Sequence, residues 1–522
     1  MRRLRSAPKV LIPAILIGIG AFSGVIDLTQ PPGPGLDPDA LAYLGAGKSL
    51  ADGHGLRVPM ASWESSDTTQ PLVHFPPAFP AAIAAGIKTG ASPVGAARVV
   101  EATAAAVTSI ALLLAANVAG GILATIVVLG ILASTPALIV VHATILSEPL
   151  FLALLSLFTW QLSRERRGVG TKRTLILGAI AAAATLTRYA GVSLVVALVF
   201  EAWWTVEGKW RETLKLRAKR AAIAAELPVA VLAIWVLTRP HSEGAEKIRE
   251  VGLYTRGLGA TLAGGFGTAA RWLAPGVHDD LARAMAAIAV FAAILALLLR
   301  TILAARRGLL PASELRSYRA TAIVLFSYAA VVFASRLLAD PGIPLDDRML
   351  APVFLLVALR VGVALAAFWR ASLIPHRGIV LFTIMITASW MWGAEEVSAA
   401  LIEDYRADGS DLASHEWTAS PLVEWAAHAP PGTALYSNWP SAIWFHSGRA
   451  AHELPSDLDT NTVREFREKV EREHAVVLSF TVHAPDYPAP DSLAMRAGLV
   501  PVGRWPDGTV WRAPADTVRL HP

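Results

Sequence analysis

The chain has 522 residues, of which 54% are hydrophobic and only 17% are charged. Soluble proteins carry about 25% charged residues, so this composition argues against an ordinary soluble enzyme and for a membrane protein. The net charge of +5 does not indicate nucleic-acid binding, because the basic residues gather in short loops between apolar segments. The absence of cysteine excludes disulfides and thiolate metal sites.

Apolar segments follow one another from the N-terminus to about residue 393, in blocks long enough to cross a hydrocarbon layer about 30 Å thick as helices. We therefore predict a mostly α-helical bundle with about eleven transmembrane helices at 1–393, and a small soluble α/β domain at 394–522. The expected helices cover residues 10–28, 94–116, 120–141, 149–163, 173–187, 189–206, 221–238, 283–304, 320–338, 349–369 and 378–393.

Lysine and arginine cluster in alternate connections between these helices, which predicts that those connections are cytoplasmic. The N-terminus is then cytoplasmic, its first helix a retained anchor, and the C-terminal domain extracytoplasmic. The clusters contain Arg2, Arg3, Arg5 and Lys9; Arg164, Arg166, Arg167, Lys172 and Arg173; Lys209, Arg211, Lys215, Arg217, Lys219 and Arg220; Arg306, Arg307, Arg316 and Arg319; and Arg370 with Arg377.

The first outer loop, residues 29–93, carries two nearby carboxylates. Asp37-Pro38-Asp39 precedes a run in helical register to Leu50, so Asp39 could cap that helix while Pro38 fixes its start. The second carboxylate, Asp37, favours a chemical role over capping alone. Later in the loop, His74-Phe75-Pro76-Pro77 leads into an eleven-residue apolar stretch, which is too short to span and is expected to be interfacial or re-entrant.

Residues 174–204 form an apolar segment between two basic loops. Both flanks are expected to be cytoplasmic, so the chain crosses twice in two short passes, and the turn at Arg188 lies below the outer surface. A charge at that depth requires a negative partner, unless the side chain snorkels to the interface.

Two other outer turns carry charges. Glu148 is the only acid of the turn before the fourth helix, and Asp346-Asp347-Arg348 opens the tenth, where the two aspartates could simply favour the helix N-terminus. Taken together, these turns place acids and arginines on one side of the membrane. Such a set suits a charged lipid headgroup and acid–base chemistry.

These same residues resemble motifs of the GT-C superfamily of membrane glycosyltransferases, in particular the bacterial branch related to protein O-mannosyltransferases and the lipid A aminoarabinose transferase. The resemblance spans nearly the whole chain. It is carried by Asp39-Ala-Leu-Ala-Tyr43, Pro76-Pro77, Ser147-Glu148-Pro149, Leu186-Thr187-Arg188-Tyr189-Ala190-Gly191, Arg348-Met349-Leu350-Ala351-Pro352, Tyr436-Ser437-Asn438-Trp439-Pro440 and Ser447-Gly448-Arg449.

The resemblance implies that a sugar moves from a polyprenyl-phosphate donor to a hydroxyl of a glycan, lipid or protein acceptor, with inversion, at the outer face of a bacterial inner membrane. Asp39 would be the catalytic base, with Asp37 and Glu148 as further catalytic acids. Arg188 and Arg348 would bind the donor phosphate.

The remaining site residues follow from the same resemblance. His74 would replace the lysine that aminoarabinose transferases place before the Pro-Pro pair, where this chain has Phe75. Tyr43, Tyr189 and Asp347 would contact the substrates. No cofactor is expected, since there is no Gly-rich phosphate loop. A divalent metal is left open, because the family varies in metal dependence and no residue spacing here demands one.

Two other functions fit the sequence less well. A secondary transporter fits the helix count, but the chain shows no convincing internal repeat and its polar groups gather at one face. A membrane-anchored glycan- or lipid-binding protein leaves the loop carboxylates unexplained.

The soluble domain is expected to play an accessory or acceptor-binding role. Its predicted elements are a helix at 411–429, a strand at 434–437, a helix at 462–474, a strand at 475–480 and a hairpin at 500–511, in a partly parallel sheet.

Overall fold

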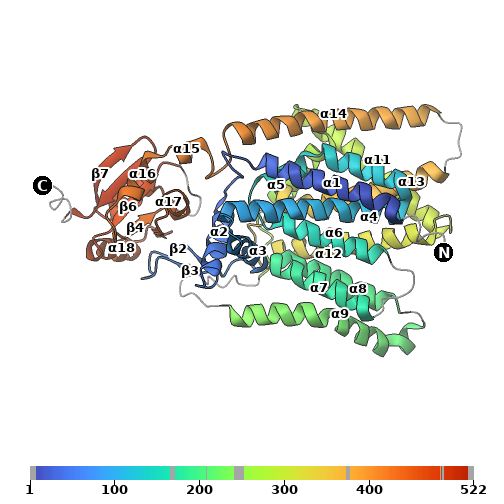
Figure 1. Ribbon diagram of the computed structural model, residues 1–522, viewed down its shortest axis with the longest axis horizontal. Coiled ribbons are helices and arrows are strands. Elements are labelled where there is room, and N and C mark those ends of the chain that lie inside the picture. Colours follow the sequence, from blue (N-terminus) through green and yellow to red (C-terminus); the bar gives the residue numbers. More distant parts are fainter. Residues whose placement is uncertain are drawn as a thin grey trace.

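A computed structural model describes residues 7–164, 171–206, 208–239, 252–371, 377–482, 484 and 487–514. A long helical bundle is joined end to end with a small α/β unit that contains the C-terminal part of the chain (Figure 1). We call the end of the bundle that faces this unit the domain end. Arg2, Arg3, Arg5, Arg166 and Arg167 of the predicted basic clusters lie outside the described residues.

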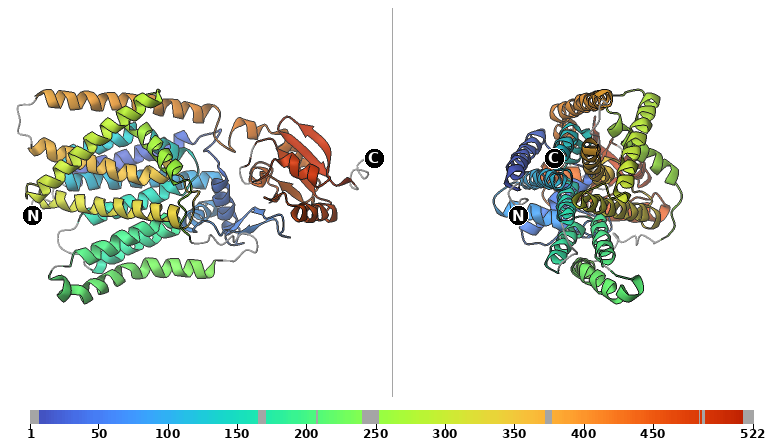
Figure 2. Two further views of the ribbon diagram at one scale, coloured as in Figure 1. Left: turned by 180° about the vertical axis from the view of Figure 1, so that it is seen from behind. Right: turned by 90° about the vertical axis from the view of Figure 1, so that its right-hand side faces the viewer.

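Among the described residues, six helices are long and apolar enough to cross a membrane, as expected of a multi-pass membrane protein. They are α1, α4, α9, α11, α12 and α13, whereas α6, α7 and α8 are shorter, and the count of eleven spans stays a prediction. The bundle helices are α1 (Ala7–Leu28), α4 (Pro93–Ser134), α5 (Pro136–Ala143), α6 (Glu148–Ser163), α7 (Thr171–Thr187), α8 (Val192–Trp204), α9 (Trp210–Thr238), α10 (Leu258–Leu273), α11 (Asp280–Arg306), α12 (Ala312–Leu338), α13 (Asp347–Ala371) and α14 (Arg377–Ala407). Figure 2 shows the bundle from behind and from one end.

Helix α4 contains the helix predicted at 94–116 and most of the one predicted at 120–141, whose last residues belong to α5, and it is kinked at Gly121, whose backbone is not helical. The φ of 71° at Gly121 lies in the left-handed region, which glycine adopts without steric cost. Glu101, near the start of α4, accepts a hydrogen bond from the Leu146 N–H beyond α5 at 2.7 Å. The start of α4 and the segment that follows α5 therefore lie at the same end of the bundle.

The predicted pair of short helices around Arg188 is present as α7 and α8, joined by a single 3-10 turn, η1 (Tyr189–Gly191). The turn brings Gly191 against the end of α7, so closely that a Cβ at this position would lie 2.3 Å from the backbone of Ala184. Only glycine permits this approach, and Arg188 is thereby fixed at the turn.

The loop at 29–93 is largely structured and lies between the bundle and the α/β unit (Figure 1). The predicted helix to Leu50 is α2, and the eleven-residue apolar stretch is α3, which packs against α2 and α4. The loop elements are α2 (Pro38–Ala51), β1 (Arg57–Val58), β2 (Met60–Ala61), β3 (Gln70–Pro71) and α3 (Ala78–Lys88).

The C-terminal unit is a six-stranded sheet with helices, in the order β2-β5-β4-β6-β8-β7. Strands β2, β5, β4 and β6 run parallel and β8 and β7 are antiparallel, which confirms the predicted partly parallel sheet and its terminal hairpin. The elements are α15 (His415–Thr418), α16 (Pro421–His428), β4 (Leu435–Ser437), α17 (Pro440–Ser447), β5 (Ala451–Glu453), α18 (Thr460–Arg472), β6 (Val476–Phe480), α19 (Pro490–Arg496), β7 (Val500–Trp505) and β8 (Gly508–Arg512).

Several boundaries differ from the sequence-based prediction: α9 begins at Trp210 and α12 at Ala312, earlier than the predicted 221 and 320. The helix predicted at 411–429 is divided into α15 and α16, because Ser420 caps a new helix by accepting from the Val423 N–H and Pro421 has no N–H to continue the old one. The helix predicted at 378–393 continues to Ala407, where it reaches the C-terminal unit.

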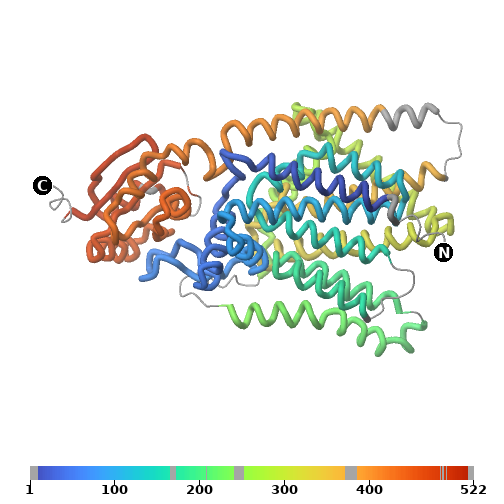
Figure 3. Tube along the Cα trace, in the orientation of Figure 1, coloured from blue at the N-terminus to red at the C-terminus, as the bar shows by residue number. Residues whose placement is uncertain are grey.

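The loop and the C-terminal unit share both a sheet and a core. Strand β2, which belongs to the loop, pairs with β5 and forms the edge of the C-terminal sheet. Leu41 and Phe79 of the loop lie in one buried cluster with Trp417 and Ile443. The trace in Figure 3 shows how closely the loop approaches the C-terminal unit.

Candidate active site

Arg348, at the start of α13, holds three carboxylates at the domain end. Its Nε donates to Glu148 Oε1 at 2.8 Å, and its two terminal nitrogens donate to Asp37 Oδ2 and Asp39 Oδ2, each at 3.0 Å. The three acids come from loop 29–93 and from the start of α6. We call Asp37, Asp39, Glu148, Arg188 and Arg348 the charged cluster; the sequence placed all five on the same side of the membrane.

The two loop carboxylates have different structural roles. Asp37, not Asp39, caps α2: its Oδ1 accepts from the Ala40 N–H at 2.7 Å, and Pro38 occupies the first turn. The capping role considered for Asp39 is therefore wrong, because the helix begins two residues earlier, at Pro38. The side chain of Asp39 is 36% exposed, and its described hydrogen bond engages one of its two oxygens.

Asp37 is also electrostatically unusual. Burial raises the pKa of Asp37 to about 7, and the neighbouring charge of Asp39 acts in the same direction, although Arg348 and the Ala40 N–H oppose the shift. Like charges held close together cannot all ionise easily, and such strain is typical of functional sites.

Arg188 meets Glu148, which is buried at the start of α6. Its terminal nitrogen lies 2.5 Å from Glu148 Oε2 and donates to Ser147 Oγ at 3.1 Å. The negative partner that the sequence demanded is therefore Glu148, and snorkelling is not needed to explain this arginine. The other terminal nitrogen of Arg188 faces the sulfur of Met349 at 3.6 Å, a weak acceptor.

Tyr43 lies one helical turn after Asp39 and points into the same site. Its hydroxyl is 3.1 Å from Ser147 Oγ, and burial raises the pKa of Tyr43 above its usual value. The rings of Phe75 and Phe79 pack against it, with centroids 4.8 and 5.2 Å away. Tyr43 thus links α2 to the turn that carries Glu148.

Three other predicted site residues are placed differently. Asp347 binds α10: its oxygens accept from Trp272 Nε1 at 2.7 Å and from Arg271 at 3.1 Å. His74 and Tyr189 are exposed, and Tyr189 lies on the turn that carries Arg188. The roles of these three residues in binding phosphate or substrate stay predictions.

Sequence reasoning missed Glu101, which is fully buried in α4. One of its oxygens holds the Leu146 N–H, just before Ser147 and Glu148, while the other has no hydrogen-bond partner among the described residues. An ionisable residue inside an apolar span is a functional signal, so Glu101 could have been found within the predicted helix 94–116. Met349 and Tyr328 gave no such signal, because apolar and aromatic residues are common in spans.

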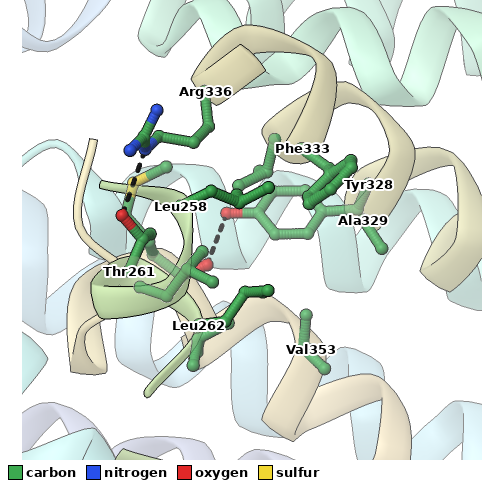
Figure 4. A pocket seen from close by; sticks show the side chains of 12 residues that line it. Leu258, Thr261, Leu262, Tyr328, Ala329, Phe333, Arg336 and Val353 are labelled. Carbon is green, nitrogen blue, oxygen red and sulfur yellow. Dashed lines mark hydrogen bonds between the residues drawn. The ribbon is translucent and has the colours of Figure 1, made fainter. Parts of the chain in front are cut away.

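An apolar cavity of about 270 Å³ lies beside the charged cluster, between α10, α12 and α13. Met349, which contacts Arg188, forms part of its wall, and Tyr328 donates from its hydroxyl to the Met349 carbonyl at 2.8 Å. Arg336 lies at another part of the wall and donates to Thr261 (Figure 4). The cavity therefore offers an apolar space next to cationic groups.

The described residues include no group of three or more His, Cys, Asp or Glu side chains arranged to hold a metal ion. The three carboxylates of the charged cluster are instead bound by arginine.

Neither a protein-family model nor a curated protein sequence matches this chain. Solved structures do match. ArnT from Cupriavidus metallidurans bound to undecaprenyl phosphate superposes with a TM-score of 0.58 and 13% identity over 97% of this chain and 98% of that one. The oligosaccharyltransferase AglB from Archaeoglobus fulgidus, in complex with an inhibitory peptide and a dolichol-phosphate, gives 0.55 and 12% over 91% and 70%. The mycobacterial arabinofuranosyltransferase AftD gives 0.52 and 15% over 96% and 40%.

At these sequence identities the comparisons establish the fold alone. The match to ArnT spans both the helical bundle and the C-terminal unit, since it covers nearly the whole of each chain. The architecture that the sequence motifs implied is thereby confirmed. The chain has the fold of the GT-C membrane glycosyltransferases.

Proposed function

We propose that this protein is a glycosyltransferase that moves a sugar from a polyprenyl-phosphate donor to an acceptor hydroxyl. The observation that carries the proposal is the convergence of three carboxylates on Arg348, with Arg188 beside them and an apolar cavity adjoining. The solved structures with this fold support it, because two of them hold undecaprenyl phosphate and dolichol-phosphate, respectively.

Arg188 is the main candidate for binding the donor phosphate. One side of its guanidinium is held by Glu148 and Ser147, while the other faces the Met349 sulfur. A phosphate oxygen that replaced the sulfur would accept a stronger, charge-assisted hydrogen bond. Arg348 is already engaged by three carboxylates, so its role is to organise the acids and to add positive charge near the phosphate.

Asp39 is the catalytic base in this proposal. A sugar hydroxyl is a poor nucleophile, so a base must take its proton as oxygen attacks the anomeric carbon. Asp39 is the most exposed of the three acids, and it does not cap α2. The bond from the anomeric carbon to the phosphate oxygen breaks as the new bond forms. A single displacement of this kind inverts the anomeric centre.

Asp37 and Glu148 hold the reacting groups in place. Asp37 fixes the start of α2, and Glu148 joins the two arginines through its two oxygens. The isoprenoid chain of the donor would occupy the apolar cavity, with its phosphate end toward Arg188. The domain end then faces outward from a bacterial inner membrane, as the distribution of basic residues predicts.

The test is a comparison of lipid extracts from a strain that lacks the protein with extracts from its parent. We expect a polyprenyl-phosphate sugar to accumulate in the deletion strain and to disappear when the wild-type protein is restored. Asp39→Asn should not clear it, whereas Asp52→Asn, at the exposed far end of α2, should. Absence of any accumulated lipid-linked sugar would refute the proposal, and clearance by Asp39→Asn would refute the role of this residue.

A further inference from the structure

The segment that leads into Asp37 is the centre of a three-part backbone junction. Gly35 forms a parallel bridge with Thr144, and Leu36 forms one with Asp411. The Gly35 N–H donates to Ala143 O at 2.8 Å, and the Ile145 N–H donates to Gly35 O at 3.0 Å. On the other side, the Leu412 N–H donates to Leu36 O at 3.1 Å.

Each part of this junction continues into a functional region. The central part continues directly into Asp37 and Asp39, and the Thr144 part continues into Ser147 and Glu148. The third part, Asp411–Leu412, opens the C-terminal unit. The junction therefore sets the spacing between both groups of acids and ties that spacing to the C-terminal unit.

Two further contacts hold the C-terminal unit onto the junction. His446, on α17, donates from Nε2 to Leu412 O at 2.7 Å. Strand β2 and the shared buried cluster fix the rest of the loop to the same unit. Movement of the C-terminal unit would therefore displace the backbone immediately before Asp37.

We infer that the C-terminal unit acts as a positioning element for the catalytic carboxylates, with Gly35 and His446 as positioning residues. The inference rests on the proposed function and goes beyond an accessory or acceptor-binding role for this unit. Gly35 is critical because a Cβ there would lie 2.6 Å from Thr144 Oγ1 and 3.2 Å from Asp411 Oδ2. A methyl group at this position must displace the Thr144 side chain and crowd Asp411, and we expect it to push the two outer parts of the junction apart.

Gly35→Ala is the decisive variant, and Gly24→Ala is its matched control, because a Cβ at Gly24 has no neighbour within 4 Å. At saturating donor we expect Gly35→Ala to lower kcat by about 10- to 100-fold, since a displacement of about 1 Å in an active site can have an effect of this size. The KM for the donor should rise by a smaller factor than kcat falls, because Arg188 lies on a separate turn and is reached only through Ser147 and Glu148. Gly24→Ala should leave both constants unchanged.

His446 provides an independent variant that lies outside the charged cluster. His446→Ala removes the hydrogen bond to Leu412 O and should lower kcat by about 3- to 10-fold, whereas His446→Gln retains a donor and should restore most of it. Wild-type kcat in both Gly35→Ala and His446→Ala would overturn the inference, as would a loss confined to KM.

Hydrogen exchange separates this inference from the proposed function. Gly35→Ala should increase amide exchange at residues 35–43 and 144–148, and Gly24→Ala should not. If the wild type transfers no sugar, the proposed function fails, while the exchange data still decide whether the junction holds these segments. Unchanged exchange at both segments in Gly35→Ala would refute the positioning role.

Discussion

The two ends of the helical bundle handle buried charge differently. At the end remote from the C-terminal unit, buried Glu201 and Glu314 each face one arginine: Arg319 at 2.6 Å and Arg370 at 2.5 Å, respectively. At the domain end, three carboxylates converge on one arginine and a second arginine stands beside them.

The difference separates structural charge from functional charge. A one-to-one pair neutralises a buried glutamate and leaves little to exchange with a ligand. Three acids share one guanidinium, and the pKa of Asp37 is raised, chiefly by burial and further by repulsion from Asp39. Such repulsion is retained where a proton or an anion must be exchanged, so the domain end is where chemistry is expected.

The strongest test of this contrast is Asp39→Asn. The amide cannot accept a proton, so we expect transfer to fall by about 10²- to 10⁴-fold, measured as the rate at saturating donor with purified protein. Binding of undecaprenyl phosphate should persist, because Asp39 does not hold Arg188. Glu201→Gln, at the remote end, is the control and should transfer normally. An active Asp39→Asn protein would move the base to Asp37.

Arg188→Lys tests the phosphate site. Lysine keeps the charge but cannot hold Glu148 and a phosphate with one planar group, so we expect undecaprenyl phosphate to bind about 10- to 100-fold more weakly. Titration in detergent or nanodiscs measures the affinity. Arg319→Lys is the matched change at the remote end and should leave the affinity unaltered. Equal affinity in the Arg188 and Arg319 variants would argue against a phosphate site at Arg188.

Asp37→Asn tests the raised pKa of Asp37, which burial and the charge of Asp39 produce together. The pKa of Asp37 is raised from 3.8 to about 7 in the folded protein, so ionisation of Asp37 opposes folding. Its contribution to stability is therefore lost as pH rises from about 4 to 7, and it is constant above that. Asparagine retains the cap and cannot ionise. The variant should gain stability relative to the wild type as pH rises to 7, measured as the unfolding midpoint at a series of pH values. A pH-independent difference would show that Asp37 is not strained.

The smallest effect is expected from Glu314→Gln. Arg370 is about half exposed and can turn toward water when its partner is neutralised, so we expect a loss of stability of about 1 kcal/mol or less. Transfer should change by less than about twofold. A large loss of activity would break the distinction between the two ends of the bundle.

The sequence identified many parts of this arrangement. The apolar blocks predicted the helices, and alternating basic loops placed Asp37, Asp39, Glu148, Arg188 and Arg348 on one side. The motif Asp39-Ala-Leu-Ala-Tyr43 lies in the run that the sequence placed in helical register, and α2 carries both residues. The short apolar segment at 174–204 between two basic loops predicted the turn that carries Arg188, which lies between α7 and α8.

Other features depend on contacts between segments far apart in the chain. Arg348 meets Asp37, Asp39 and Glu148 across 311, 309 and 200 residues, and no local pattern indicates which acid it holds. Strand β2 is two residues long and gains its identity only from pairing with β5. A strand this short has no periodicity to detect.

The sequence by itself determined the membrane character, the side on which the charges lie and the presence of a partly parallel sheet, because hydrophobic periodicity and charge are local properties. Only the tertiary structure decided that Asp37 caps α2, that Arg348 gathers the acids and that the C-terminal unit shares a core with the loop at 29–93. These features are set by which helix ends and strand edges pack together. That choice depends on the summed contacts of the whole chain, so no single position in the sequence indicates it.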